Sequence, residues 1–388
     1  MKQIVFLLLI LLFLTGCGGE SIPEATTIPP VPETTAPPET TIPPDPVDLL
    51  LSSLTLEQKV GQLFIAAPEQ VTGGDPVTAM TDTLAAALVR YPLGGIILFS
   101  QNIETPEQLI SLNQALADSS PISPFLAVDE EGGIVARLAN HDAFDLPTYQ
   151  SAGAVGSSGN PEDATQMGKV IGGYLHQYGF NLNFAPVADV NTNPDNPVIG
   201  TRAFSSDPAI AAEMVSAFAA GLREEGIIAT VKHFPGHGDT AEDSHSGLAV
   251  VYKTMEELEN CEFLPFREAA SRDMVMVGHI TLPNVTGDMT PATLSRQIVT
   301  DILKEQLGFE GLVVTDAMEM GAIVETYGSG TAAVAALQAG CDIILMPENL
   351  PEAFDAVLAA LEDGSLSMEW LDATVSRILN FKQLHGIL

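Results

Sequence analysis

Basic residues are scarce in this sequence: 15 Lys and Arg stand against 50 Asp and Glu, for a formal net charge of −35 at pH 7. Proteins that bind nucleic acids neutralise phosphates with clustered Lys and Arg, and a negative field repels such partners. The composition therefore excludes nucleic acid as a partner. A solvated surface accounts for most of the acidic side chains, so the charge alone identifies no substrate.

Cysteine is also rare, with three residues in 388. Cys261 and Cys341 lie far apart within apolar runs, which is typical of buried free thiols rather than of a disulfide or a metal pair. No cluster of Cys and His has the spacing of a zinc site, and no glycine-rich phosphate loop follows the first expected strand. We therefore expect neither a metal nor an organic cofactor.

A continuous apolar run, Ile4 to Leu14, follows Lys2 at the N-terminus and ends in Leu-Thr-Gly-Cys. The run is too short to span a bilayer comfortably and is typical of a signal peptide. A cysteine at the cleavage position resembles the lipobox of bacterial lipoproteins, in which the thiol carries a diacylglycerol. We predict a signal peptide at 1–16 and an extracytoplasmic protein anchored to a membrane through lipid on Cys17. A secretory signal with an incidental cysteine is the alternative.

Residues 17–46 combine this cysteine with a segment dominated by Pro and Thr. Such a segment has too few apolar residues to form a core, so it predicts an extended, semi-rigid spacer. Residues 47–388 then form the folded part, which we expect to be one domain.

Eight apolar runs bounded by Gly and Pro predict parallel strands that are buried on both faces. They are Gln62–Ala66, Gly95–Phe99, Phe125–Val128, Leu182–Pro186, Ile228–Lys232, Val275–His279, Leu312–Thr315 and Asp342–Met346. Amphipathic helices are expected between them at Pro106–Ala117, Glu162–Tyr178, Pro208–Glu225, Met255–Arg272 and Leu294–Gln306, with a last helix at Met368–Leu384. Eight such units predict an α/β fold of the TIM (β/α)8 barrel type. A doubly wound open sheet is the rival.

Polar residues follow five of these strands at their carboxyl ends, where a barrel enzyme carries its chemistry. Asp316 follows a wholly apolar strand, so its buried carboxylate needs partners, and Lys232 and Arg202 are expected to keep it ionised. Asp243 and His245 lie in a polar loop beyond Lys232. In an extended chain positions i and i+2 point to the same side, so the two can form a hydrogen-bonded pair. Paired groups of this kind are what glycoside hydrolysis requires.

Five strings, LTLEQKVGQLF, VDEEGG, NPVIGTRAF, KHFPGHGDT with DSH, and VVTDAMEM, resemble glycoside hydrolase family 3 in its bacterial β-N-acetylglucosaminidase branch. The resemblance covers roughly residues 50–388. It implies a retaining exo-acting enzyme that removes terminal N-acetylglucosamine from cell-wall fragments or chito-oligosaccharides through a covalent glycosyl-enzyme. Position by position, it implies Asp316 as nucleophile, His245 with Asp243 as acid/base, and binding of sugar hydroxyls by Asp129, Arg137, Arg202, Lys232 and His233.

Three alternatives stay open at this point. A relative of the same family could act as a β-N-acetylglucosaminide phosphorylase or as a β-glucosidase. A surface lipoprotein that binds glycans without turnover is a third, although it should have lost Asp316 or His245 and both are present. We expect the protein to act as a monomer.

Overall fold

The computed structural model describes residues 45–241, 247, 249–267 and 273–388. The predicted signal peptide, Cys17, nearly all of the spacer, and Asp243 with His245 lie outside the described residues. Within the part that the structure describes, no helix combines the length and the apolar character needed to cross a membrane.

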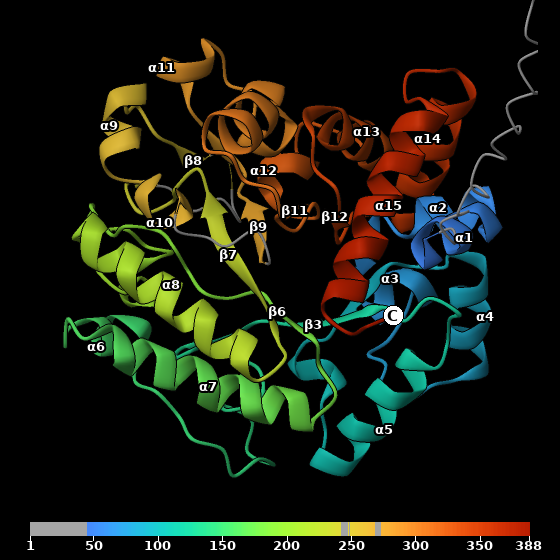
Figure 1. The fold of residues 1–388 in the computed structure, drawn as a ribbon, viewed down its shortest axis with the longest axis horizontal. Helices are drawn as coiled ribbons and strands as arrows, with labels where there is room; N and C mark the ends of the chain where they lie inside the picture. Colours follow the sequence, from blue (N-terminus) through green and yellow to red (C-terminus); the bar gives the residue numbers. More distant parts are fainter. Residues whose placement is uncertain (1–44, 242–246, 248, 268–272) are drawn as a thin grey trace, which may run out of the picture. The chain divides into compact units, whose positions relative to one another are not determined.

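A parallel barrel forms the centre of the described domain (Figure 1). Its strands are β1 (Phe64–Ala66), β2 (Gly95–Ile97), β3 (Phe125–Val128), β6 (Leu182–Asn183), β7 (Ile228–Phe234), β9 (Met274–Val277), β11 (Leu312–Thr315) and β12 (Ile344–Leu345). Each pairs in parallel with the next along the chain, and β12 pairs with β1. A parallel bridge between Val314 and Ile343 joins β11 to β12. The predicted (β/α)8 barrel is confirmed.

Every residue of these eight strands is buried, which explains why they appear in the sequence as continuous apolar runs rather than as alternating patterns. The ladders of β3 and β11 have the predicted bounds, whereas β6 and β12 are shorter than expected. Short ladders are enough here because the flanking segments turn out of the barrel and carry the polar loops.

Helices surround the barrel, and α7 and α8 lie side by side on one flank (Figure 1). The longer ones are α4 (Asp82–Arg90), α5 (Pro106–Ala117), α7 (Pro161–Gln177), α8 (Pro208–Glu224), α13 (Ser329–Ala339), α14 (Leu350–Glu362) and α15 (Met368–Leu384). The shorter ones are α1 (Pro46–Ser53), α2 (Leu56–Gly61), α3 (Pro68–Thr72), α6 (Ala152–Gly156), α11 (Pro283–Thr286) and α12 (Gly321–Val324), with single turns η1 (Ser100–Asn102), η2 (Gly200–Arg202) and η3 (Ala292–Leu294).

Two predicted helices differ from the structure. The helix expected at Met255–Arg272 is broken into α9 (Met255–Asn260) and α10 (Leu264–Arg267). Pro265 lacks an amide hydrogen, so it is tolerated in the first turn of α10 but not within one long helix. The helix expected at Leu294–Gln306 begins later, as the π-type helix η4 (Gln297–Gln306) after the turn η3.

A buried lysine closes the amino-terminal end of the barrel, opposite the loops that follow the strands. The Lys382 ammonium on α15 donates to Gln62 Oε1 at 2.8 Å, to the Gly94 carbonyl at 2.9 Å and to the Ser123 carbonyl at 3.0 Å. It also lies 4.7 Å from the centre of the Phe125 ring. Burial lowers the pKa of Lys382 to about 7. These contacts connect the last helix to the starts of the first three strands.

Candidate active site

A cavity of about 310 Å³ opens at the carboxyl ends of the strands. Its polar lining includes Asp129 after β3, Arg137 after the small strand β5 (Val135–Ala136), Arg202 in η2, Lys232 and His233 at the end of β7, and Asp316 after β11. The structure thus brings together six of the eight predicted catalytic and binding residues. The other two, Asp243 and His245, lie outside the described residues. A cavity of this size suits a single sugar ring.

Glu131 is the centre of a buried ionic network at the closed end of the cavity. Arg202 donates to its carboxylate through Nε and Nη2, both at 2.8 Å, in a bidentate pair. The Lys232 ammonium lies 2.7 Å from Glu131 Oε1 and 2.8 Å from Asp129 Oδ1. Burial opposes ionisation of Glu131, but Lys232 and Arg202 outweigh it and hold the pKa of that carboxyl far below its usual range.

This network corrects one expectation. Lys232 and Arg202 were expected to keep Asp316 ionised; both are bound directly to Glu131, and of the two only Lys232 is among the groups that lower the pKa of Asp316. Burial also opposes ionisation of Asp316, yet its pKa is lowered, first by His233 and His279, then by the Ala317 amide and Lys232. The Ala317 amide donates to Asp316 Oδ1 at 2.8 Å. An ionised carboxylate at the end of β11 is therefore available as a nucleophile.

Asp189 orients His233, one of the two histidines that line this cavity among the described residues. The His233 ring donates from Nδ1 to Asp189 Oδ2 at 2.7 Å, and the His237 amide donates to Asp189 Oδ1 at 2.6 Å. Asp189 is almost completely buried, yet the opposing effect of His233 outweighs burial and lowers its pKa. A carboxylate on Nδ1 fixes both the tautomer and the plane of the ring. Burial is the main cause that lowers the pKa of His237.

A second buried carboxylate, Glu130, supports the segment that carries Arg137. Its oxygens accept from the Leu138 and Ala139 amides, both at 2.9 Å, and from the Tyr174 hydroxyl at 2.8 Å. Burial raises the pKa of Glu130 despite these donors. The backbone that follows Arg137 is thereby held, and the guanidinium itself extends over the Phe99 ring, 5.4 Å from its centre.

Described residues before and after the segment with Asp243 and His245 are connected by hydrogen bonds and ion pairs. Thr192 donates to Asp239 Oδ1 at 2.8 Å, and Lys253 lies 3.4 Å from the same oxygen. Lys253 also forms an ion pair with the buried carboxylate of Glu262. Among the described residues, no group of three or more His, Cys, Asp or Glu side chains is arranged to hold a metal ion.

Sequence reasoning did not assign roles to Glu130, Glu131 and Asp189. Three carboxylates in a row after a strand were visible in the string VDEEGG, but alternation alone does not tell which of them point to the cavity. Asp129 and Glu131 share that side, as residues i and i+2 of an extended segment do, and Glu130 points away. This i and i+2 periodicity was the sequence signal that could have identified Glu131 as a cavity residue beside Asp129.

Comparisons with known proteins find relatives of this chain in one family. A model of the glycosyl hydrolase family 3 N-terminal domain matches residues 55–381. Beta-hexosaminidase A of Pseudoalteromonas piscicida is 36% identical over 365 residues, which cover 85% of this chain and 61% of that protein. A beta-hexosaminidase of Stenotrophomonas maltophilia is 34% identical over 291 residues, covering 74% of this chain and 84% of that protein.

Among solved structures, a glycoside hydrolase family 3 β-N-acetylglucosaminidase from Paenibacillus is 40% identical with a TM-score of 0.80. The match covers 86% of this chain and 63% of that one. The chain therefore spans less than two thirds of the length of this protein and of the Pseudoalteromonas relative.

Proposed function

This chain belongs to glycosyl hydrolase family 3, and we propose that it is a retaining exo-β-N-acetylglucosaminidase. Its substrates would be glycans with a terminal, non-reducing N-acetylglucosamine, either cell-wall fragments or chito-oligosaccharides. The relatives named beta-hexosaminidase and the β-N-acetylglucosaminidase structure support this activity. No cofactor takes part in the proposed reaction.

One observation carries the proposal: a carboxylate with a lowered pKa, Asp316, lines the same cavity as the buried cluster around Glu131. A nucleophile of a retaining glycosidase must be ionised at working pH and must face a bound sugar. Asp129, Lys232 and Arg202 present fixed donors and acceptors from the closed end, where hydroxyls of the terminal sugar would bind. Because these side chains are already paired, the site is preorganised for a ligand.

In the glycosylation step, an Asp316 oxygen attacks the anomeric carbon and forms a glycosyl ester. The bond from that carbon to the bridging oxygen breaks, and His245 gives its proton to this oxygen as the leaving sugar departs. Asp243 would stabilise the protonated ring of His245. A histidine suits this role at neutral pH because its ordinary pKa is about 6.5.

In the second step, His245 takes a proton from water while the water oxygen attacks the anomeric carbon. The ester bond breaks, Asp316 leaves as a carboxylate, and N-acetylglucosamine is released with its original configuration. The roles of Asp243 and His245 rest on the sequence motif, since both lie outside the described residues.

The test begins with the purified protein and p-nitrophenyl N-acetyl-β-glucosaminide, beside the corresponding glucoside. We expect release of p-nitrophenol from the first, with the β-anomer as the initial product by NMR. Asp316→Asn should abolish turnover without changing the circular dichroism spectrum, and a 5-fluoro glycosyl inhibitor should label Asp316. A label on Glu319 would move the nucleophile, and an α-anomeric product would disprove the retaining mechanism. Formation of a sugar phosphate in phosphate buffer would identify a phosphorylase instead.

We also propose that the protein is held at the outer side of a cell membrane by lipid on Cys17, and that it acts there as a monomer. The N-terminal motif supports the anchor, and the Pro- and Thr-rich spacer suits an enzyme that must reach glycans. Cys17→Ala should move the protein from the membrane fraction to the soluble fraction or block its processing. An unmodified N-terminus in a fully soluble wild type would contradict the anchor. Light scattering of the released protein measures its molar mass and so tests whether it is a monomer.

A further inference from the structure

The carboxylates that line the cavity range from deeply buried at its closed end to exposed at its mouth. At the closed end the side chains of Lys232 and Glu131 are 4% and 3% exposed. Glu319, which follows the nucleophile strand, lines the same cavity but is exposed to solvent. An exo-acting glycosidase binds the terminal sugar at the closed end, so the leaving sugar must lie towards the mouth. Glu319 is therefore placed on the side of the leaving sugar.

Glu319 is the most exposed acidic residue of this lining. Among the described residues that line the cavity, the basic side chains are Arg137, Arg202 and Lys232 together with the imidazoles of His233 and His237, and the acidic ones are Asp129, Glu131, Asp316 and Glu319. Glu131 and Asp129 neutralise Arg202 and Lys232 through direct ion pairs. Arg137, the most exposed of the three bases at 31%, faces Asp129 at 3.8 Å. Among the described residues, no ion pair joins Glu319 to a basic side chain of the lining.

The Glu319 carboxylate is positioned by a contact from the neighbouring helix α3. The Gln70 side-chain amide donates to Glu319 Oε2 at 3.1 Å and to the Pro347 carbonyl at 2.8 Å. Partial burial, and then the neighbouring carboxylate of Glu348, raise the pKa of Glu319. A neighbouring negative charge thus acts on Glu319 at this mouth, and the net charge of −35 on the whole chain adds a repulsive field of longer range.

We propose that the mouth selects against leaving sugars that carry a carboxylate, so that the preferred substrates are uncharged chito-oligosaccharides rather than glycans in which N-acetylglucosamine is linked to N-acetylmuramic acid. This inference rests on the proposed function and narrows its two substrate classes to one. An N-acetylglucosamine leaving sugar presents only neutral hydroxyl and amide groups, which a carboxylate can accept from. A lactyl carboxylate on the same ring would meet Glu319 as a like charge. Two like charges about 3–4 Å apart, in surroundings as polar as bulk water, weaken binding by roughly five- to tenfold.

The experiment compares three disaccharides that share a terminal β-1,4-linked N-acetylglucosamine. Their second sugar is N-acetylglucosamine, N-acetylmuramic acid, or the methyl ester of the latter, which keeps the shape but removes the charge. With the full chain at low ionic strength, kcat/KM for the ester should exceed that for the acid about five- to tenfold. The chitobiose should be the best of the three, and added salt should narrow the gap between ester and acid. Equal values for ester and acid would overturn the inference.

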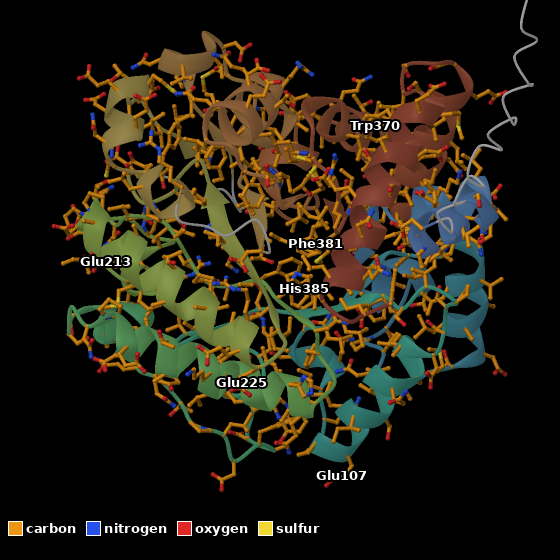
Figure 2. All side chains as sticks on the ribbon, viewed as in Figure 1. Glu107, Glu213, Glu225, Trp370, Phe381 and His385 are labelled. Atoms are coloured by element: carbon orange, nitrogen blue, oxygen red, sulfur yellow. The ribbon has the colours of Figure 1, made fainter. Side chains whose placement is uncertain are left out.

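Glu319→Gln assigns the effect to one side chain. The variant should bring the ester-to-acid ratio of kcat/KM close to one, because the amide keeps the shape and loses the charge. Glu213→Gln is the matched control: it removes one exposed carboxylate from α8 (Figure 2) and should leave the ratio of the wild type. A ratio that both variants leave unchanged overturns the role of Glu319. Hydrolysis of the aryl glycoside distinguishes failure of the proposed function from failure of this inference. If the aryl glycoside is not hydrolysed, both are wrong. If it is hydrolysed and the wild type has an ester-to-acid ratio of one, only the inference is wrong.

Discussion

The buried carboxylate of Glu131 offers the sharpest test of how the site is held together. Glu131→Gln keeps the shape of the side chain but leaves Arg202 and Lys232 facing a neutral amide. Arg202 then keeps its bond from Nη1 to the Val198 carbonyl at 3.2 Å and can donate to the one remaining side-chain oxygen at position 131, and Lys232 keeps Asp129. Removing one partner of a buried ion pair typically costs about 3–5 kcal/mol, because the remaining charge is left uncompensated. For a domain of this size that corresponds to a fall in Tm of roughly 4–7 °C.

The pH dependence gives this prediction a second, independent readout. The folded-state pKa of Glu131 is far below its ordinary value, so its contribution to stability is complete above the unfolded-state pKa of about 4.3 and is lost as the pH falls below it. The difference in free energy of unfolding between wild type and Glu131→Gln should therefore be constant from pH 6 to 8 and should shrink below about pH 4.3.

Urea unfolding followed by circular dichroism measures that difference, with Glu213→Gln as the exposed control, which should change stability by less than about 0.5 kcal/mol. The variant should also lose activity, because Lys232 and Arg202 line the cavity and a displacement of about 1 Å can cost about 10²-fold in rate. A Glu131→Gln protein as stable as the control at pH 7 would refute the reasoning. So would a stability difference that grows as the pH falls.

Three further predictions follow from the same contacts. Asp189→Asn should lower kcat/KM about 10- to 100-fold and remove the low-field Nδ1 proton signal of His233 from the NMR spectrum; an unchanged signal would contradict the pairing. His245→Ala should lower the rate about 10²–10⁴-fold on disaccharides but less on an activated aryl glycoside, and added azide should restore turnover with a β-glycosyl azide as product. Equal losses of rate on both substrates, without that product, would mean that His245 only binds the sugar. Lys382→Met should destabilise the protein by about 1–3 kcal/mol for each buried oxygen left without a donor. The activity of the folded fraction should stay within about twofold of the wild type, because Lys382 lies at the opposite end of the barrel. A larger loss of activity would show that the two ends of the barrel are coupled.

The pattern of apolar residues was enough to predict the barrel. Strands that are buried on both faces are apolar along most of their length, and each one here is bounded by Gly, Pro or polar residues. The eight strands can therefore be recognised from the sequence alone. The positions of Asp316 and Lys232 at strand ends followed from the same pattern, because all parallel strands of a barrel present their carboxyl ends to one face. Helix bounds were predicted where a cap or a proline marks them, as at α5, and failed where Pro265 interrupts an otherwise helical stretch.

The partners of each charge were decided by the tertiary structure alone. Arg202 and Glu131 are separated by 71 positions, and His233 and Asp189 by 44, so local periodicity carries no information on which charge meets which. Sequence reasoning accordingly assigned Lys232 and Arg202 to Asp316 and left Glu131 and Asp189 without a role. Buried charges need direct partners, and several candidates of each sign follow the strands. Only the closing of the barrel, which sets the distance between strand ends, selects one pairing among them.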